Sequence, residues 1–243
     1  MKVAFDLSGR RILVTGAGAG IGAAAAVSCA RMGAEALLID VASSERIAEA
    51  IRSEGGRATS FVADAASRSD MKRLSAEIGA VDGLVLNAAV CPWDEDWLSD
   101  DWDASFNRVM NANVLGPIHV LRAFLPAMME RRRGHVVFVG SLAGRSGGLI
   151  AGPHYVASKG AVHALVKWLA RQAAPRNVVV NGVAPASIET PMMRDRPVDI
   201  DRIPLARMGK PEEIGWPIAF LCSDAASYIC GTVIDVNGGV YMA

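Results

Sequence analysis

The sequence predicts a doubly wound α/β fold, in which one parallel sheet of about seven strands carries helices on both faces. Two observations support this prediction. Short runs rich in Val, Ile and Leu alternate with longer amphipathic segments, and the runs are apolar at nearly every position, as in strands that are buried on both faces. No long linker, repeat or low-complexity segment divides the 243 residues. We therefore expect a single domain over 1–243.

The apolar runs predict the strands in order, at 11–15, 36–40, 58–62, 82–86, 135–140, 177–183 and 232–236. Apolar residues at helical spacing predict the helices between them, at 20–32, 44–54, 67–79, 101–131, 154–173 and 211–223. The stretch 187–204 is the least regular part of the chain and follows the sixth strand. We expect it to form a substrate loop over the carboxyl edge of the sheet.

The composition excludes several classes of function. Lys and Arg number 25 and Asp and Glu number 25, which argues against nucleic acid or an anionic membrane as a partner. No run of about 18 apolar residues and no signal-peptide segment is present, so we expect a soluble, cytoplasmic protein. Four widely spaced cysteines without a C-x-x-C pair suggest neither a disulfide nor a metal site. The acidic cluster at 94–103 is interpreted as a solvated loop and helix start.

A glycine-rich turn, Thr-Gly-Ala-Gly-Ala-Gly-Ile-Gly at 15–22, joins the first strand to the first helix. Such a turn brings backbone N–H groups and the positive end of a helix to a pyrophosphate, which is typical of a Rossmann-like dinucleotide site. The second strand ends at Asp40, where a carboxylate can accept the ribose hydroxyls of NAD and repel the 2′-phosphate of NADP. Val41 follows in place of a basic residue. The sequence therefore favours NAD.

Tyr155 and Lys159 are four residues apart in Tyr-Val-Ala-Ser-Lys, and Ser141 ends an apolar run upstream. On a helix, positions i and i+4 share one face. A cation beside a phenol favours the phenolate and lowers the phenol pKa toward the range that is useful for proton transfer. The three residues are therefore candidates for acid/base catalysis.

Together these residues resemble the short-chain dehydrogenases/reductases over nearly the whole chain, from Gly9 to Gly239. The matching segments are the glycine turn, Leu-Asn-Ala-Ala at 86–89, Asn-Val-Leu-Gly at 113–116, Ser141 with Tyr155-x-x-x-Lys159, Asn-Gly-Val-Ala-Pro at 181–185, Thr-Pro-Met at 190–192, Arg-Met-Gly-Lys-Pro-Glu-Glu at 207–213 and Val-Asn-Gly-Gly at 236–239.

The resemblance implies a catalytic tetrad of Asn113, Ser141, Tyr155 and Lys159. In it Tyr155 exchanges the proton, Lys159 lowers the tyrosine pKa and binds the nicotinamide ribose, Ser141 binds the substrate oxygen, and Asn113 anchors a water. It also implies cofactor contacts from Gly16, Gly20, Ile21, Gly22, Asp40, Asp64, Ala65, Asn87, Ala88, Tyr155, Lys159, Pro185, Ile188 and Thr190. Asp64 has a helix-capping role as its alternative.

The chain departs from the family pattern at three places. Ala89 and Ala186 replace glycines, and 14 positions separate Ser141 from Tyr155, one more than is usual, so the loop through Gly147 and Gly148 is expected to absorb a residue. We expect these changes to alter the shape of the substrate pocket and to leave the reacting groups in place.

The leading hypothesis is an NAD-dependent oxidoreductase that acts on a secondary alcohol or ketone. The alternatives are a 3-oxoacyl thioester (acyl-carrier-protein) reductase and a non-catalytic nucleotide-binding scaffold. Trp93 and Trp97 either line the pocket or pack, and His154 is a candidate for substrate contact. The helices at 101–131 and 154–173 resemble the family's dimer helices, which implies a homodimer or homotetramer.

Overall fold

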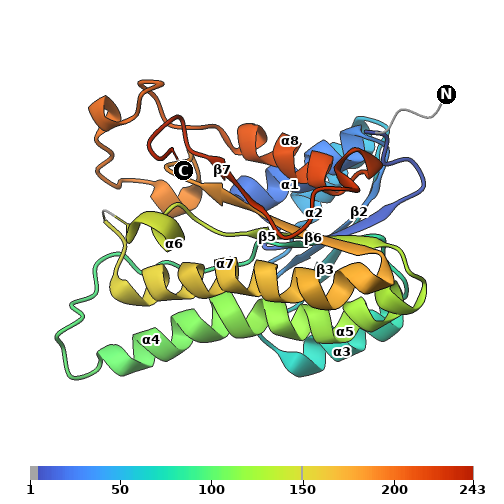
Figure 1. Ribbon diagram of the computed structural model, residues 1–243, viewed down its shortest axis with the longest axis horizontal. Helices are drawn as coiled ribbons and strands as arrows, with labels where there is room; N and C mark the ends of the chain where they lie inside the picture. The colour runs from blue at the N-terminus through green and yellow to red at the C-terminus, as the bar shows by residue number, and fades with distance from the viewer. Residues whose placement is uncertain (1–4, 149, 243) are drawn as a thin grey trace.

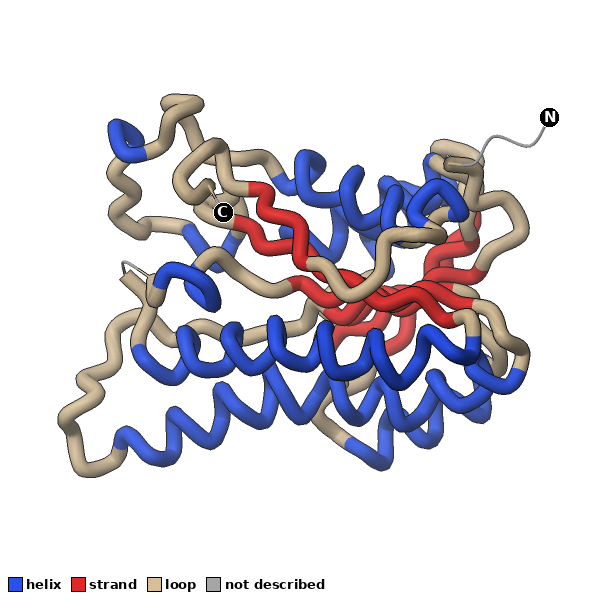
Figure 2. Tube along the Cα trace, viewed as in Figure 1, coloured by secondary structure: helices blue, strands red, loops and turns tan. Residues whose placement is uncertain are grey.

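The computed structural model describes residues 5–148 and 150–242 of the chain. A seven-stranded sheet with the order β3-β2-β1-β4-β5-β6-β7 runs through the centre, and helices cover both of its faces (Figure 1; Figure 2). The strands are β1 Arg11–Thr15, β2 Glu35–Asp40, β3 Arg57–Val62, β4 Gly83–Leu86, β5 Gly134–Val139, β6 Val178–Pro185 and β7 Val233–Val236. Within the described residues, all pairings between these strands are parallel. The predicted doubly wound, Rossmann-like sheet is confirmed.

The helices are α1 Gly20–Arg31, α2 Glu45–Ser53, α3 Arg68–Ile78, α4 Trp102–Met110, α5 Gly116–Glu130, α6 Ala143–Ser146, α7 Pro153–Ala173 and α8 Pro211–Leu221. In Figure 1, α3, α4, α5 and α7 lie below the sheet, and α1, α2 and α8 lie above it. No helix in the described part of the chain is both long and apolar enough to cross a membrane.

Each face of the sheet has its own hydrophobic core. Leu13, Leu84 and Val136 pack below the sheet with residues of α3, α5 and α7. Their chain neighbours point the other way, so that Val14 and Val137 pack above it with α1 and α8. Successive side chains of a strand point to opposite faces, which explains why strands covered by helices on both faces read as unbroken apolar runs.

The sheet order places a topological switch between β1 and β4. The chain leaves β1 toward β2 on one side, and β4 lies on the other side of β1. At such a switch the loops after the strands are expected to diverge and to leave a crevice at the carboxyl edge, where open α/β sheets bind ligands. The glycine turn after β1 and the segment after β4 both lie at this edge.

The structure divides the helix that was predicted at 101–131. A π-helical segment, η1 Asn111–Leu115, separates α4 from α5. A π segment within a helix inserts an extra residue and often marks a functional site, and this one contains Asn113. The irregular stretch 187–204 holds two short 3₁₀ turns, η3 Pro191–Met193 and η4 Ile200–Arg202.

Candidate active site

Three of the predicted catalytic residues meet at the carboxyl edge of the sheet. Ser141 follows β5, while Tyr155 and Lys159 lie on successive turns of α7. The side chain of Ser141 hydrogen-bonds that of Tyr155, and the Nζ atom of Lys159 lies 5.5 Å from the centroid of the Tyr155 ring. Lys159 donates a hydrogen bond to the carbonyl oxygen of Val139 at 2.9 Å. The end of β5 and one face of α7 thus bring together the three side chains that were predicted to act in acid/base catalysis.

Burial controls the electrostatics of this group. It raises the pKa of Tyr155 above its ordinary value, Cys91 adds to the rise, and the hydrogen bond from Ser141 acts in the opposite direction. Burial also lowers the pKa of Lys159 to about 8 and raises that of the Cys91 thiol to about 12. The protein groups alone therefore do not lower the phenol pKa. This differs from the effect of Lys159 that the sequence predicts.

Asn113 is buried, and its amide fixes the segment that follows β4. Its Oδ1 accepts from the Val90 N–H at 2.8 Å and its Nδ2 donates to the Val90 carbonyl at 3.0 Å, in the manner of a strand pair. The same Nδ2 donates to the hydroxyl of Ser158 at 3.0 Å. The π-helical turn thereby ties the edge of the crevice to α7.

Two residues next to the tetrad escaped the sequence reasoning. Ser158 donates to the carbonyl oxygen of Tyr155 at 2.8 Å and joins it to Asn113. His163 Nε2 accepts from the N–H of Ser141 at 3.4 Å, and a side chain at Gly140 would collide with that ring. Ser158 is three residues after Tyr155 and His163 is four after Lys159, so each shares a helix face with a predicted catalytic residue. This spacing could have identified them from the sequence.

The glycine turn has the shape that a dinucleotide needs. A Cβ on Gly22 would lie 2.0 Å from the carbonyl oxygen of Gly16, so only glycine allows this close approach. Asn87 holds the turn by donating from Nδ2 to the carbonyl oxygens of Thr15 at 2.9 Å and Gly16 at 3.0 Å. Helix α1 begins at Gly20 without a side-chain cap on Ala19, which leaves N–H groups for a phosphate.

Asp40 lies beside this turn, as its place at the end of β2 predicts. Its Oδ2 accepts from the N–H of Gly18 at 2.9 Å, and its Oδ1 accepts from the N–H of Ala42 at 3.2 Å. Val41 is 69% exposed. The carboxylate is thus held at the rim of the crevice with an apolar side chain beside it.

The structure also locates the other residues that were predicted to bind the cofactor. Ala88 donates its N–H to the hydroxyl of Thr15 at 3.1 Å, and Thr190 packs against Gly20, where a Cβ would lie 3.2 Å from its methyl group. The remaining four are Ile21 at the start of α1, Ala65 after β3, Pro185 at the end of β6 and Ile188 beyond it.

Asp64 is exposed, and its Oδ1 accepts from the N–H of Ala66 at 2.8 Å. The cap of α3 is Ser67, whose hydroxyl accepts from the N–H of Asp70 at 3.2 Å. The helix-capping alternative for Asp64 was therefore wrong.

Trp93 lies beside Tyr155. The centroids of the Trp93 and Tyr155 rings are 6.5 Å apart. Trp93 Nε1 donates to the carbonyl oxygen of Met192 at 3.0 Å, and the guanidinium of Arg196 lies 5.8 Å from the Trp93 ring. Arg196 also binds both carboxylate oxygens of Asp94, at 2.7 and 2.9 Å. The loop after β4 therefore contacts the stretch 187–204 directly.

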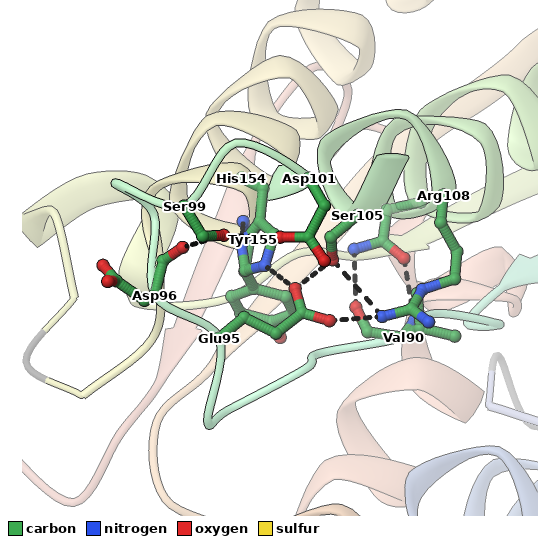
Figure 3. A network of polar contacts seen from close by, with 10 residues as sticks. Val90, Glu95, Asp96, Ser99, Asp101, Ser105, Arg108, His154 and Tyr155 are labelled. Carbon is green, nitrogen blue, oxygen red and sulfur yellow. Dashed lines mark hydrogen bonds and ion pairs between the residues drawn. The ribbon is translucent and has the colours of Figure 1, made fainter. Parts of the chain in front are cut away.

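The structure also places Trp97, His154 and the acidic cluster. Trp97 is 59% exposed and does not share the place of Trp93. His154 is buried and lies against Trp102 and Glu95 rather than facing the crevice (Figure 3). Within residues 5–148 and 150–242, no group of three or more His, Cys, Asp or Glu side chains is placed to hold a metal.

Comparison with known proteins agrees with this geometry. The sequence model described as Enoyl-(Acyl carrier protein) reductase matches residues 16–241. The 3-oxoacyl-(acyl-carrier-protein) reductase of Thermotoga maritima is 36% identical over 96% of this chain and 98% of that protein. The galactitol 2-dehydrogenase (L-tagatose-forming) of Cereibacter sphaeroides is 38% identical over 98% of this chain and 97% of that protein.

Among solved structures, a putative 2-deoxy-D-gluconate 3-dehydrogenase from Agrobacterium tumefaciens with bound NADP superimposes with a TM-score of 0.91. It is 33% identical, and the match covers 98% of this chain and 99% of that one. The relatives named here are a reductase and two dehydrogenases. The chain belongs to the short-chain dehydrogenase/reductase family.

Proposed function

We propose that this oxidoreductase uses NAD to oxidise a secondary alcohol to a ketone, or to run the reverse reduction. The observation that carries the reaction type is the convergence of Ser141, Tyr155 and Lys159 at the carboxyl edge, beside a glycine turn that only glycines can form. When bound, the nicotinamide supplies the hydride acceptor. A scaffold protein without turnover would not need this buried acid/base group.

In the proposed mechanism Ser141 donates a hydrogen bond to the substrate oxygen and holds it beside the phenol. Tyr155 takes the hydroxyl proton during oxidation and returns it during reduction. Because burial raises the pKa of the phenol, the phenolate needs stabilisation by positive charge. Lys159, with its amine held 2.9 Å from the Val139 carbonyl, supplies that charge and a hydrogen bond to the nicotinamide ribose.

The preference for NAD is supported by Asp40. Its carboxylate is anchored on the N–H of Gly18 at the end of the strand where the adenine ribose would lie. A 2′-phosphate there would face this negative charge, and the exposed Val41 offers it no cation. We expect the adenine side to be completed by Asp64, Ala65, Asn87 and Ala88, and the carboxamide side by Pro185, Ile188 and Thr190.

The function is tested by a panel of sugars, cyclic alcohols, hydroxy acids and steroids, with formation of NADH followed by absorbance. Binding isotherms for NAD and NADP on the same preparation test the cofactor separately. Turnover of a secondary alcohol with NAD supports the proposal. A tenfold tighter binding of NADP than of NAD would contradict the cofactor assignment.

A second candidate is reduction of 3-oxoacyl thioesters, which is favoured by the identity to the Thermotoga maritima reductase. In this alternative the same Tyr155 donates its proton to a ketone, so the tetrad does not distinguish the two reactions. Asp40 argues against this alternative if the thioester reductase reaction requires NADPH. Comparison of kcat/KM for a 3-oxoacyl thioester with NADPH and for the best alcohol with NAD separates the two candidates.

We further propose that the chain forms a homodimer or homotetramer through the helices below the sheet. Trp168 on α7 is 59% exposed and Leu115 before α5 is 40% exposed, and packing of two copies through these helices would bury both side chains. Light scattering of the wild type and of Trp168→Glu tests this, because a charge in a helix interface should dissociate it.

A further inference from the structure

His154 directly precedes the catalytic tyrosine and is only 1% exposed. Its ring stacks on Trp102, with centroids 5.6 Å apart and planes inclined by 28°. Its Nδ1 accepts a hydrogen bond from the backbone N–H of Tyr155 at 2.8 Å. In the neutral ring Nδ1 is therefore the unprotonated nitrogen, and Nε2 carries the proton.

The protonated nitrogen faces a carboxylate on a different segment. Nε2 of His154 lies 3.2 Å from Oε2 of Glu95, and it donates to that oxygen. Glu95 belongs to the loop after β4 and is also bound by Arg108 of α4, at 2.6 Å from Oε1, and by the hydroxyl of Ser105. Figure 3 shows the imidazole between Glu95 on one side and the start of α7 on the other.

The position of Glu95 matters because of what the same loop carries. Trp93 is two residues upstream, and its ring is 6.5 Å from the ring of Tyr155. The imidazole thus contacts both sides of the space where a substrate would lie, through the backbone of Tyr155 and through the loop of Trp93. A change in the hydrogen bond to Glu95 would move the loop of Trp93 relative to Tyr155.

We propose that His154 and Glu95 are positioning residues that set the width of the substrate site between Trp93 and Tyr155. Neither residue touches the substrate. The proposal rests on the function proposed above for its kinetic readout, and it replaces the earlier expectation that His154 contacts substrate.

The competing explanation is that His154 simply fills space under Trp102. In that case its volume matters and its nitrogens do not. Substitution by Asn and by Gln separates these explanations, because each amide side chain can replace the hydrogen bond of only one of the two ring nitrogens. In His154→Asn the amide oxygen can replace Nδ1 toward the Tyr155 N–H but cannot reach Glu95, whereas in His154→Gln the amide nitrogen can replace Nε2 and still donate to Glu95.

The loop side is tested by Glu95→Ala, with Asp96→Ala as a matched control. Asp96 is the next residue of the same loop, and its Oδ1 accepts a local hydrogen bond from the N–H of Leu98 at 3.0 Å. We expect His154→Asn and Glu95→Ala to raise KM for the alcohol about tenfold, which corresponds to one lost charge-assisted hydrogen bond. The kcat and the KM for NAD should change less than about twofold.

His154→Gln should restore a KM close to that of the wild type, and Asp96→Ala should not change it. In the double variant of His154→Asn with Glu95→Ala, KM should be no higher than in Glu95→Ala, because that change already removes the bond to His154 together with those to Arg108 and Ser105. Equal effects of His154→Asn and His154→Gln, or independent effects that multiply in the double variant, would overturn the proposal.

Hydrogen exchange provides a readout that needs no substrate. Amides of residues 91–98 should exchange faster in His154→Asn and in Glu95→Ala than in the wild type or in Asp96→Ala. If the wild type oxidises none of the alcohols, the proposed function fails, but this exchange pattern would still support the positioning role. Unchanged exchange in both variants would refute the positioning role whatever the substrate is.

Discussion

The charged amine of Lys159 lies over the phenol ring of Tyr155. Its nitrogen lies 5.5 Å from the centre of the phenol ring and 2.9 Å from the carbonyl oxygen of Val139. The pKa of this buried amine is lowered to about 8, so it still carries its charge at neutral pH. The strand end therefore holds a charged amine beside the phenol ring.

This arrangement predicts the effect of removing the phenol hydroxyl. Tyr155→Phe should lower kcat by about a thousandfold or more, because proton transfer loses its donor and acceptor. The binding of NAD should stay nearly unchanged, since the ring and Lys159 remain. Steady-state kinetics and an NAD isotherm on the same protein provide the measurement, and retention of most activity would refute the role of Tyr155.

Asp40 predicts a change of cofactor preference. Asp40→Asn should weaken NAD binding about tenfold, because a charge-assisted hydrogen bond to the ribose is lost. The double change of Asp40→Ser with Val41→Arg should favour NADP, because it removes the negative charge and adds a guanidinium for the 2′-phosphate. The ratio of kcat/KM for NAD and NADP measures this. Val41→Arg alone is the control, and it should give a smaller change than the double variant.

The sequence predicted most of the fold because the strands of a parallel sheet are encoded locally. The runs at 11–15 and 36–40 correspond to β1 Arg11–Thr15 and β2 Glu35–Asp40, and the other strands also lie within about two residues of their predicted bounds. Asn113, Ser141, Tyr155 and Lys159 were identifiable because each stands in a short motif with fixed spacing.

The features that escaped prediction depend on side chains from distant segments. The contact of His154 with Glu95 joins residues 59 positions apart, and the pair of Arg196 and Asp94 joins residues 102 apart. Neither pair has a local sequence signal, because each depends on how far a loop extends over the sheet edge. The π-helical segment at Asn113 was missed for a related reason, since its apolar spacing is continuous with the helices on both sides.

Two buried histidines predict loss of stability in mild acid. Burial lowers the pKa of His135 and of His163 to about 4, below their usual value near 6.5. The unfolded chain therefore binds more protons than the folded chain between these values, and the free energy of unfolding should fall as the pH decreases from about 6.5 to about 4. The contribution of His135 is at most ~3 kcal/mol over this window.

Urea unfolding at a series of pH values measures this effect. His135→Gln should show a flatter dependence on pH than the wild type, even if its stability at neutral pH is lower. Carboxylates with a lowered pKa, such as Glu213, change the free energy of unfolding only below about pH 4.5. They therefore do not produce the fall in stability expected between about pH 6.5 and 4.5. An equal pH dependence in wild type and variant would contradict the assignment to His135.

The contact between Arg196 and Asp94 predicts that loss of the arginine raises KM for the substrate. Arg196 binds both oxygens of Asp94 and lies over Trp93, so it connects the stretch 187–204 to the loop that faces Tyr155. Because Asp94 is 79% exposed, the ion pair should add little to global stability. Arg196→Ala should therefore leave the melting temperature nearly unchanged while raising KM for the substrate. Arg196→Lys keeps the charge but lacks the planar guanidinium that lies over Trp93, so its KM should lie between those of the wild type and Arg196→Ala. Identical KM values for all three proteins would show that the loops close without this pair.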